Sequence, residues 1–171
     1  MMMSINKATI QDIPQLVTLI NSAYRGEHSK KGWTTEANLL DGVRTDPDSL
    51  EKMMAKENAV ILKYSDEANV VQGCVYLEER DRKMYLGMLT VSPLLQAKGI
   101  GKKLLVQAEK YAEDKKCSTV EMTVISVRDE LIKWYEKYGY RKTGETKPFP
   151  SDPKFGIPKQ PLEFIVMEKV L

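Results

Sequence analysis

Apolar residues recur with two different periods along this chain, and the change of period divides it into elements. Over residues 13–24 they fall at helical spacing, which predicts an amphipathic helix. The positions concerned are Ile13, Leu16, Val17, Ile20 and Tyr24. A short strand over 4–10 precedes this helix, and a loop over 26–34 follows it. Two short helices are then predicted, over 35–43 and 47–56.

From residue 58 onward the apolar positions alternate, as they do in strands that bury one face. Gly87 lies inside one of these strands, and an interior glycine commonly marks a bulge. The predicted elements are strands at 59–64, 70–79 and 83–91, a helix at 99–116, a strand at 119–127, a helix that ends at Gly139, and strands at 140–145 and 162–171. No repeat or linker separates them, so we predict one α+β domain over residues 1–171.

The bulk composition narrows the classes of function. The chain has 171 residues, of which 42% are hydrophobic and 29% charged, as in an ordinary globular domain. Its 26 basic and 24 acidic residues leave a charge of +2, too small to predict binding to nucleic acid. No apolar run reaches membrane-spanning length, and Cys74 and Cys117 match no metal-ligand spacing. We therefore predict no nucleic acid, membrane or metal partner, with the cytoplasm as the default location.

The segment 91–105 carries the sharpest chemical signal. A strand ends there, a turn with glycines follows, and an amphipathic helix begins. The first N–H groups of a helix have no partner within it, and the helix dipole is positive at that end, so an anion is favoured there. Gly99 and Gly101 let phosphate oxygens reach the backbone without meeting a Cβ, and Lys98 and Lys102 add positive charge.

The spacing of these glycines separates three kinds of phosphate-binding loop. A P-loop needs glycine at 96 and Ser or Thr at 103, where this chain has Gln96 and Lys103. The dinucleotide fingerprint needs glycine at 104, which is Leu104. The pattern that fits is Gln/Arg-x-x-Gly-x-Gly/Ala over 96–101. It resembles the acetyl-CoA signature of the GNAT superfamily of N-acetyltransferases.

Two further segments resemble the same family in the same order. Trp134-Tyr135-Glu136-Lys137-Tyr138-Gly139-Tyr140 resembles its aromatic-Tyr-x-x-x-Gly-Phe segment, and the opening from Lys7 to Asp12 resembles its N-terminus. For the fold, this resemblance implies a mixed, mostly antiparallel sheet of about seven strands, flanked by helices and splayed between strands 4 and 5.

The resemblance also implies where acetyl-CoA binds. The cofactor would lie in the opening of the sheet, with its pantetheine arm paired to backbone and its pyrophosphate wrapped by amides. A bulge at Gly87 would free an N–H for the thioester oxygen. The cofactor-binding residues implied are Leu89, Val91, Gln96, Ala97, Lys98, Gly99, Ile100, Gly101 and Lys102.

The reaction implied is direct attack of a neutral amine on the acetyl thioester. Tyr135 matches the family tyrosine that protonates the leaving thiolate, although it also lies on the inner face of its helix, where packing is the alternative role. An alkyl amine with a pKa near ~10 must lose a proton first. Candidate bases are Glu78, Glu79, Glu121 and His28, each of which can equally be an ordinary surface group. Arg128 replaces an asparagine common among relatives, and we assign it no catalytic function.

The acceptor is the least determined part of the prediction. Tyr24, Trp33 and Phe149 lie in the segments that give this family its acceptor specificity, so we expect them to bind substrate. The proline-rich loop over 147–161 favours a small-molecule or amino-acid amine over a protein or peptide amine. A CoA-binding sensor or scaffold without turnover is the alternative function. The apolar strand over 162–171 suggests pairing across a homodimer.

Overall fold

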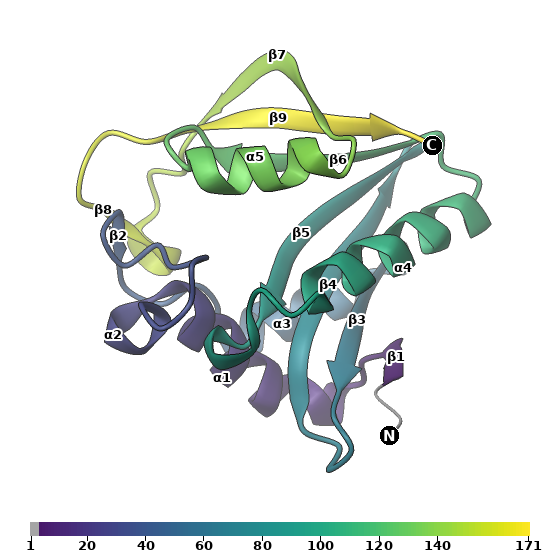
Figure 1. The fold of residues 1–171 in the computed structure, drawn as a ribbon, viewed down its shortest axis with the longest axis horizontal. Coiled ribbons are helices and arrows are strands. Elements are labelled where there is room, and N and C mark those ends of the chain that lie inside the picture. Colours follow the sequence, from purple (N-terminus) through teal and green to yellow (C-terminus); the bar gives the residue numbers. More distant parts are fainter. Residues whose placement is uncertain (1–3) are drawn as a thin grey trace.

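The computed structural model describes residues 4–171, and a seven-stranded sheet runs through this range (Figure 1). Its strand order is β1-β3-β4-β5-β6-β9-β7. The strands are β1 (Ser4–Lys7), β3 (Ala59–Ser65), β4 (Val71–Arg80), β5 (Lys83–Val91), β6 (Thr119–Ile125), β7 (Arg141–Pro148) and β9 (Glu163–Val170). Every neighbouring pair is antiparallel except β5 and β6. The predicted mixed, mostly antiparallel sheet is confirmed.

Helices and short connecting elements complete the fold. The helices are α1 (Ile13–Tyr24), α2 (Gly26–Ser29), α3 (Pro47–Met54), α4 (Ile100–Asp114) and α5 (Asp129–Lys137). Three 3₁₀ turns lie at Ile10–Asp12 (η1), Pro93–Leu95 (η2) and Pro153–Phe155 (η3), and the two-residue strands β2 (Leu40–Asp41) and β8 (Ile157–Pro158) pair with each other. Within residues 4–171, no helix is both long and apolar enough to cross a membrane.

Local chemistry explains where the helices begin and end. The N–H of Thr9 donates to the Asp12 carboxylate at 2.8 Å ahead of α1, and Asp46 accepts the N–H of Ser49 at 2.8 Å at the start of α3. These side chains satisfy N–H groups that the helix leaves without partners. Gly139, with φ of +96°, follows α5 in a conformation that favours glycine.

The sheet separates two apolar cores. Val75 and Leu77 of β4 pack with α4 and α5 on one face, while Cys74 and Tyr76 pack with α1 and α3 on the other. This alternation is the period of two that the sequence displays from residue 58 onward. Both faces of the central strands are therefore covered.

The parallel pair β5 and β6 is joined at one end only. Lys83, Met84 and Tyr85 pair with Thr119–Glu121, and no pairing continues beyond Tyr85. Figure 1 shows β5 running away from β6 and β9 as it leaves the end of the sheet near the C-terminus. The predicted splay between the fourth and fifth long strands is therefore present, and it leaves the inner edges of β5 and β6 without a strand partner there.

A bulge interrupts β5 inside this opening, one residue beyond the predicted position. Between the pairs Tyr76↔Gly87 and Cys74↔Thr90, β5 contains one residue more than β4, and Met88 has a φ of +48°. The extra residue reverses which side chains face each core. Leu86 before the bulge and Leu89 after it both contact the α4 side, whereas Met88 contacts the α1 side.

Three further expectations need correction. The helix predicted over 35–43 is wrong, because this segment forms turns and β2, whose Leu40 pairs with Pro158 far along the chain. The loop predicted over 26–34 contains the one-turn helix α2. The strand expected to pair across a homodimer is β9, which lies between β6 and β7, so both of its edges are already paired within the chain.

Candidate active site

Gly99 and Gly101 lie at the N-terminus of α4, where the sequence predicts a phosphate-binding loop. Gly99 is the residue before the helix and has a φ of +85°, and Ala97 two residues earlier has a φ of +65°. A Cβ at Gly99 would meet nothing within 4 Å, so the backbone faces open space. A Cβ at Gly101 would lie 3.3 Å from the Trp134 ring, so glycine there keeps α4 close to α5. The unpaired N–H groups of the first helical turn are thus accessible to an anion.

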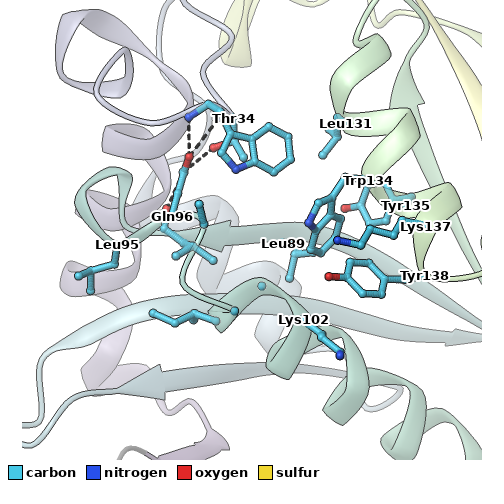
Figure 2. A pocket seen from close by; sticks show the side chains of 16 residues that line it. Thr34, Leu89, Leu95, Gln96, Lys102, Leu131, Trp134, Tyr135, Lys137 and Tyr138 are labelled. Carbon is cyan, nitrogen blue, oxygen red and sulfur yellow. Dashed lines mark hydrogen bonds between the residues drawn. The ribbon is translucent and has the colours of Figure 1, made fainter.

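A cavity of about 330 Å³ lies against this helix start (Figure 2). Its lining contains lysines at 102 and 137 and no Asp or Glu. Both lysine ammonium groups lie over the Tyr138 ring, at 5.8 and 5.6 Å from its centre. Lys98 is the one predicted cofactor residue that does not line the cavity. The lining also includes Leu89, Val91, Gln96, Ala97, Gly99, Ile100 and Gly101. We call this space the donor cavity, after the acetyl-CoA that the sequence resemblance would place here.

The side chain of Gln96 points away from the helix start and holds another segment. Its Oε1 accepts the N–H groups of Trp33 at 2.7 Å and Thr34 at 3.2 Å. Its Nε2 donates to Thr34 Oγ1 at 2.7 Å and to the Val91 carbonyl at 3.0 Å. Figure 2 shows Gln96 and Thr34 facing each other in this way. With these four bonds the side chain is fully engaged, so only the backbone of Gln96 is available to a cofactor.

A second cavity of about 420 Å³ occupies the opening between β5 and β6, and we call it the acceptor cavity. Tyr24 and Phe149, two of the residues predicted to bind substrate, line it. Phe149 packs on Phe164 with ring centres 5.2 Å apart. The third, Trp33, lines the donor cavity instead, where its ring lies 6.3 Å from that of Trp134. The structure therefore separates Trp33 from the other two.

Tyr135 lies where the two cavities meet. Together with Leu89 and Leu131 it lines both of them. Its ring packs edge-on against Trp134 and Tyr140, at 5.2 and 5.8 Å between centres. Its hydroxyl makes no hydrogen bond within residues 4–171. Burial, with a smaller contribution from Tyr24, raises the pKa of Tyr135 above its ordinary value, so the hydroxyl keeps its proton at neutral pH.

Tyr24 fixes the bulged part of β5 from the α1 side. Its buried hydroxyl donates a short hydrogen bond to the Leu89 carbonyl, and burial raises its pKa to about 12. The Met88 carbonyl accepts from the Thr90 hydroxyl at 2.9 Å and from the Cys74 thiol at 3.8 Å. Burial raises the pKa of Cys74 to about 12, so this thiol is not a nucleophile at neutral pH. These contacts hold the bulge in one conformation.

A buried ion cluster forms one wall of the acceptor cavity. Glu36 accepts from Arg25 at 3.3 Å and from Arg128 at 3.3 Å, and Arg128 also donates to the Thr34 carbonyl at 3.0 Å. All three side chains are at least nine-tenths buried, and all three line the cavity. Glu36 was not among the residues predicted from the sequence, and Arg128 was assigned no role there. The departure from the family's asparagine at 128 was the available signal.

The carboxylates considered as bases lie elsewhere. Burial acts to raise the pKa of the Glu78 carboxyl. Its hydrogen bonds from Arg80, Tyr76 and Lys56 outweigh burial and lower the pKa to about 2. Glu121 pairs with Lys83 at 3.1 Å. Neither these two nor Glu79 and His28 line either cavity. Residues 4–171 also contain no group of three His, Cys, Asp or Glu side chains able to hold a metal ion.

Comparison with known proteins places this site in a family. The model of the acetyltransferase (GNAT) domain matches residues 29–150, which is more than half of the chain. No curated protein matches it.

Solved structures with the same fold cover the whole chain. The ribosomal-protein-S18-alanine N-acetyltransferase from Escherichia coli is 14% identical, with a TM-score of 0.74 over 99% of this chain and 94% of its own. PaiA N-acetyltransferase from Thermoplasma acidophilum, in complex with coenzyme A, is 20% identical, with a TM-score of 0.71 over 100% of both chains. The ribosomal-protein-alanine N-acetyltransferase from Brucella melitensis is 20% identical, with a TM-score of 0.72 over 98% and 99%.

The splayed sheet, the glycine loop that opens α4 and the family match agree. The chain belongs to the GNAT family of acetyltransferases, enzymes that use an acyl-CoA to acylate an amine.

Proposed function

We propose that this protein transfers an acetyl group from acetyl-CoA to the primary amine of a small molecule by direct attack. The observation that carries the proposal is that a cationic cavity at the start of α4 and a second cavity meet at Tyr135. In this assignment the pyrophosphate binds the amides of residues 97–102, with Lys102 nearby. The pantetheine arm follows the free edge of β5 at Leu89 and Val91.

Each residue of the junction has a defined task in the proposed reaction. The amine nitrogen attacks the thioester carbonyl carbon, a C–N bond forms and the C–S bond breaks. An N–H group freed by the bulge at Met88 is suited to stabilise the charge that develops on the carbonyl oxygen. The amine loses one proton through water, and the sulfur gains one from the Tyr135 hydroxyl, which is then reprotonated. Both oxygens of Glu36 already bind guanidinium groups, so we assign it to holding them.

The covering of the acceptor cavity favours a small molecule. The chain between β7 and β9 passes over it, and Phe149, Pro150 and Gly156 from this stretch line the cavity. It is fastened to the opposite side by the β2–β8 pair and by Lys159, whose N–H and ammonium donate to the carbonyls of Leu39 and Ala37, both at 2.8 Å. A volume of about 420 Å³ is within the range of small-molecule sites.

Two other functions are distinguishable from this one. The names of two structural neighbours specify alanine of a ribosomal protein as their acceptor, which keeps a protein amine as an alternative here. A binding module without turnover would need no second cavity and no protonated tyrosine at the junction. A cytoplasmic location and a homodimer remain predictions.

Calorimetric titration with acetyl-CoA tests the donor site. We compare the wild type with a Gly99→Glu, Gly101→Glu double variant, which adds two carboxylates to the anion site. The control is Lys110→Glu, which makes the same change of net charge on the exposed face of α4. We expect binding to be lost in the double variant and retained in the control. Equal binding in all three folded proteins would refute the donor site.

A panel of amines with acetyl-CoA tests the reaction. Release of CoA together with an acetylated small amine supports the proposal. Acetylation of peptide N-termini alone would support the protein acceptor. Binding of acetyl-CoA with no acetylated product from either class would support the binding module.

A further inference from the structure

Arg44 occupies a fixed position on the wall of the acceptor cavity. It follows β2, and the Asn21 side chain of α1 fixes its backbone. Asn21 accepts the N–H groups of Arg44 and Thr45 at 2.8 and 3.0 Å, and donates to the Thr45 carbonyl at 3.0 Å. Arg25 donates to the carbonyl of Val43, just before it, at 3.1 Å. The backbone of Arg44 is therefore held on both sides.

The guanidinium of Arg44 has no acceptor within residues 4–171, although its side chain is partly buried. Arg25 and Arg128, by contrast, are occupied by Glu36 and by backbone carbonyls. A guanidinium presents five donors, and leaving them unsatisfied in a partly desolvated wall is unfavourable. Because its backbone is fixed beside the cavity and its donors are free, the Arg44 guanidinium is available to a ligand there.

Arg44 lies in a wall whose other two guanidinium groups are already paired. Among residues 4–171, Arg25, Arg44 and Arg128 line the cavity together with the carboxylates of Glu36 and Asp152, and Glu130 pairs with Arg128 from outside the lining at 3.3 Å. Glu36 lies between Arg25 and Arg128, and Asp152 is exposed and caps η3 by accepting the Lys154 N–H at 3.0 Å. Burial lowers the pKa of Arg25, and the nearby Glu36 carboxylate acts to raise it. The positive charge of Arg44 lowers the pKa of Arg25 further, because the Arg25 and Arg44 guanidinium groups repel each other. A bound anion would relieve that repulsion.

We propose that the amine acceptor carries a carboxylate, and that Arg44 binds this carboxylate in the acceptor cavity. The inference rests on the proposed acetyl transfer and narrows its substrate class to amino carboxylates. A planar guanidinium matches a carboxylate with two parallel hydrogen bonds. The cavity is of a size for such a molecule, and its apolar members Tyr24, Met88 and Phe149 offer contacts to the carbon skeleton.

Matched acceptors measure the contribution of the carboxylate. Each amino acid, its primary amide and its decarboxylated amine are offered with acetyl-CoA to the wild type, Arg44→Gln and Arg44→Lys. The control is Arg82→Gln, at the exposed β4–β5 turn and outside both cavities. We expect the wild type to prefer the carboxylate form at least about tenfold in kcat/KM. Arg44→Gln should lower that value about 10- to 100-fold, mainly through KM, with a much smaller effect on the amide.

The lysine variant and a stability control separate recognition from a structural role. Arg44→Lys keeps the charge but loses the planar fork, so its kcat/KM should lie between those of the wild type and Arg44→Gln. Thermal unfolding checks that each variant is folded. The inference is overturned if the wild type prefers the amide or the decarboxylated amine. It is also overturned if Arg44→Gln lowers turnover of the acid and the amide equally.

A binding measurement distinguishes failure of this inference from failure of the proposed function. If acetyl-CoA binds but no amine is acetylated, the proposed transfer fails. The carboxylate site at Arg44 is then tested alone. The CoA-loaded protein is then titrated with the same amino acids and amides. Carboxylate binding that is weakened in Arg44→Gln supports the site, and absence of carboxylate binding overturns it.

Discussion

Replacing Gln96 by alanine tests whether the loop at the start of α4 holds the segment of Trp33 and Thr34, which lines the donor cavity. The side chain makes four hydrogen bonds, three of them to Trp33 and Thr34. The same segment is attached on its other side by Arg128, which donates to the Thr34 carbonyl. The substitution therefore removes one of the two hydrogen-bonded attachments of Trp33 and Thr34, and it leaves the ring contact of Trp33 with Trp134 and the ion cluster in place.

The expected loss follows from the number and setting of these bonds. A neutral hydrogen bond contributes about 1 kcal/mol net, so four would amount to about 4 kcal/mol. The site is only partly buried, and water can replace some of the partners, which reduces the loss. We expect the free energy of unfolding to fall by about 2–3 kcal/mol. For a chain of this length, that corresponds to roughly 5–10 °C in Tm.

Urea unfolding measures the global loss, and amide hydrogen exchange measures the local one. Exchange at Trp33 and Thr34 should accelerate about 10- to 100-fold. Gly32→Ala provides an independent route to the same perturbation, because its Cβ would lie 2.4 Å from Gln96 Oε1 and displace the amide. Gln107→Ala is the control, an exposed glutamine of α4.

A loss below about 0.5 kcal/mol in Gln96→Ala, with unchanged exchange at Trp33 and Thr34, would refute this account of the loop. A large global loss without any change in local exchange would also contradict it, because the effect would then lie outside the attached segment.

Three further predictions concern single side chains. Tyr135→Phe keeps the ring packing and removes the proton donor, so kcat should fall on the order of 100-fold. Binding of acetyl-CoA, measured by calorimetry, should be retained, and unchanged turnover would remove Tyr135 from the reaction. Glu36→Gln leaves Arg25 and Arg128 buried without the carboxylate that they share, so the free energy of unfolding should fall by about 3 kcal/mol. A urea midpoint equal to that of the wild type would contradict this. The pKa of Glu78 is lowered from 4.5 to about 2, so its contribution to stability is present above pH 4.5 and is lost as the pH falls towards 2. The difference in stability between the wild type and Glu78→Gln should therefore be on the order of 3 kcal/mol at pH 7 and shrink below pH 4.5. A difference that stays constant from pH 7 to pH 3 would exclude this titration.

Elements with a long, regular apolar pattern could be predicted from the sequence. Helix α4 buries one stripe and β4 buries alternate residues on two faces, so local periodicity and burial agree. In residues 35–43 the local sequence pattern and the observed structure disagree. Their composition suits a helix, but Leu40 pairs with Pro158, and pairing between distant segments is not encoded locally.

The residues of the candidate site divide in the same way, into those that depend on local backbone and those that depend on contacts with distant segments. The effect of glycine at 99 and 101 is on the local backbone, so a local motif was sufficient to propose the loop. The pairing of Glu36 with Arg128 joins positions that are 92 residues apart. The role of the Gln96 side chain also depends on contacts 62 and 63 residues away. Such contacts become visible only once the strands have arranged the loops around the opening.

The two cavities share Leu89, Leu131 and Tyr135, and this arrangement bears on which acyl chains can be used. A pocket closed at its end would exclude long chains by collision. Here the donor cavity lies beside the acceptor cavity, so an acyl chain that extends past Tyr135 would enter the space that the amine needs. We therefore expect longer acyl-CoAs to bind as well as acetyl-CoA and to act as competitors of the amine. Chain-length preference would then vary with the size of the acceptor.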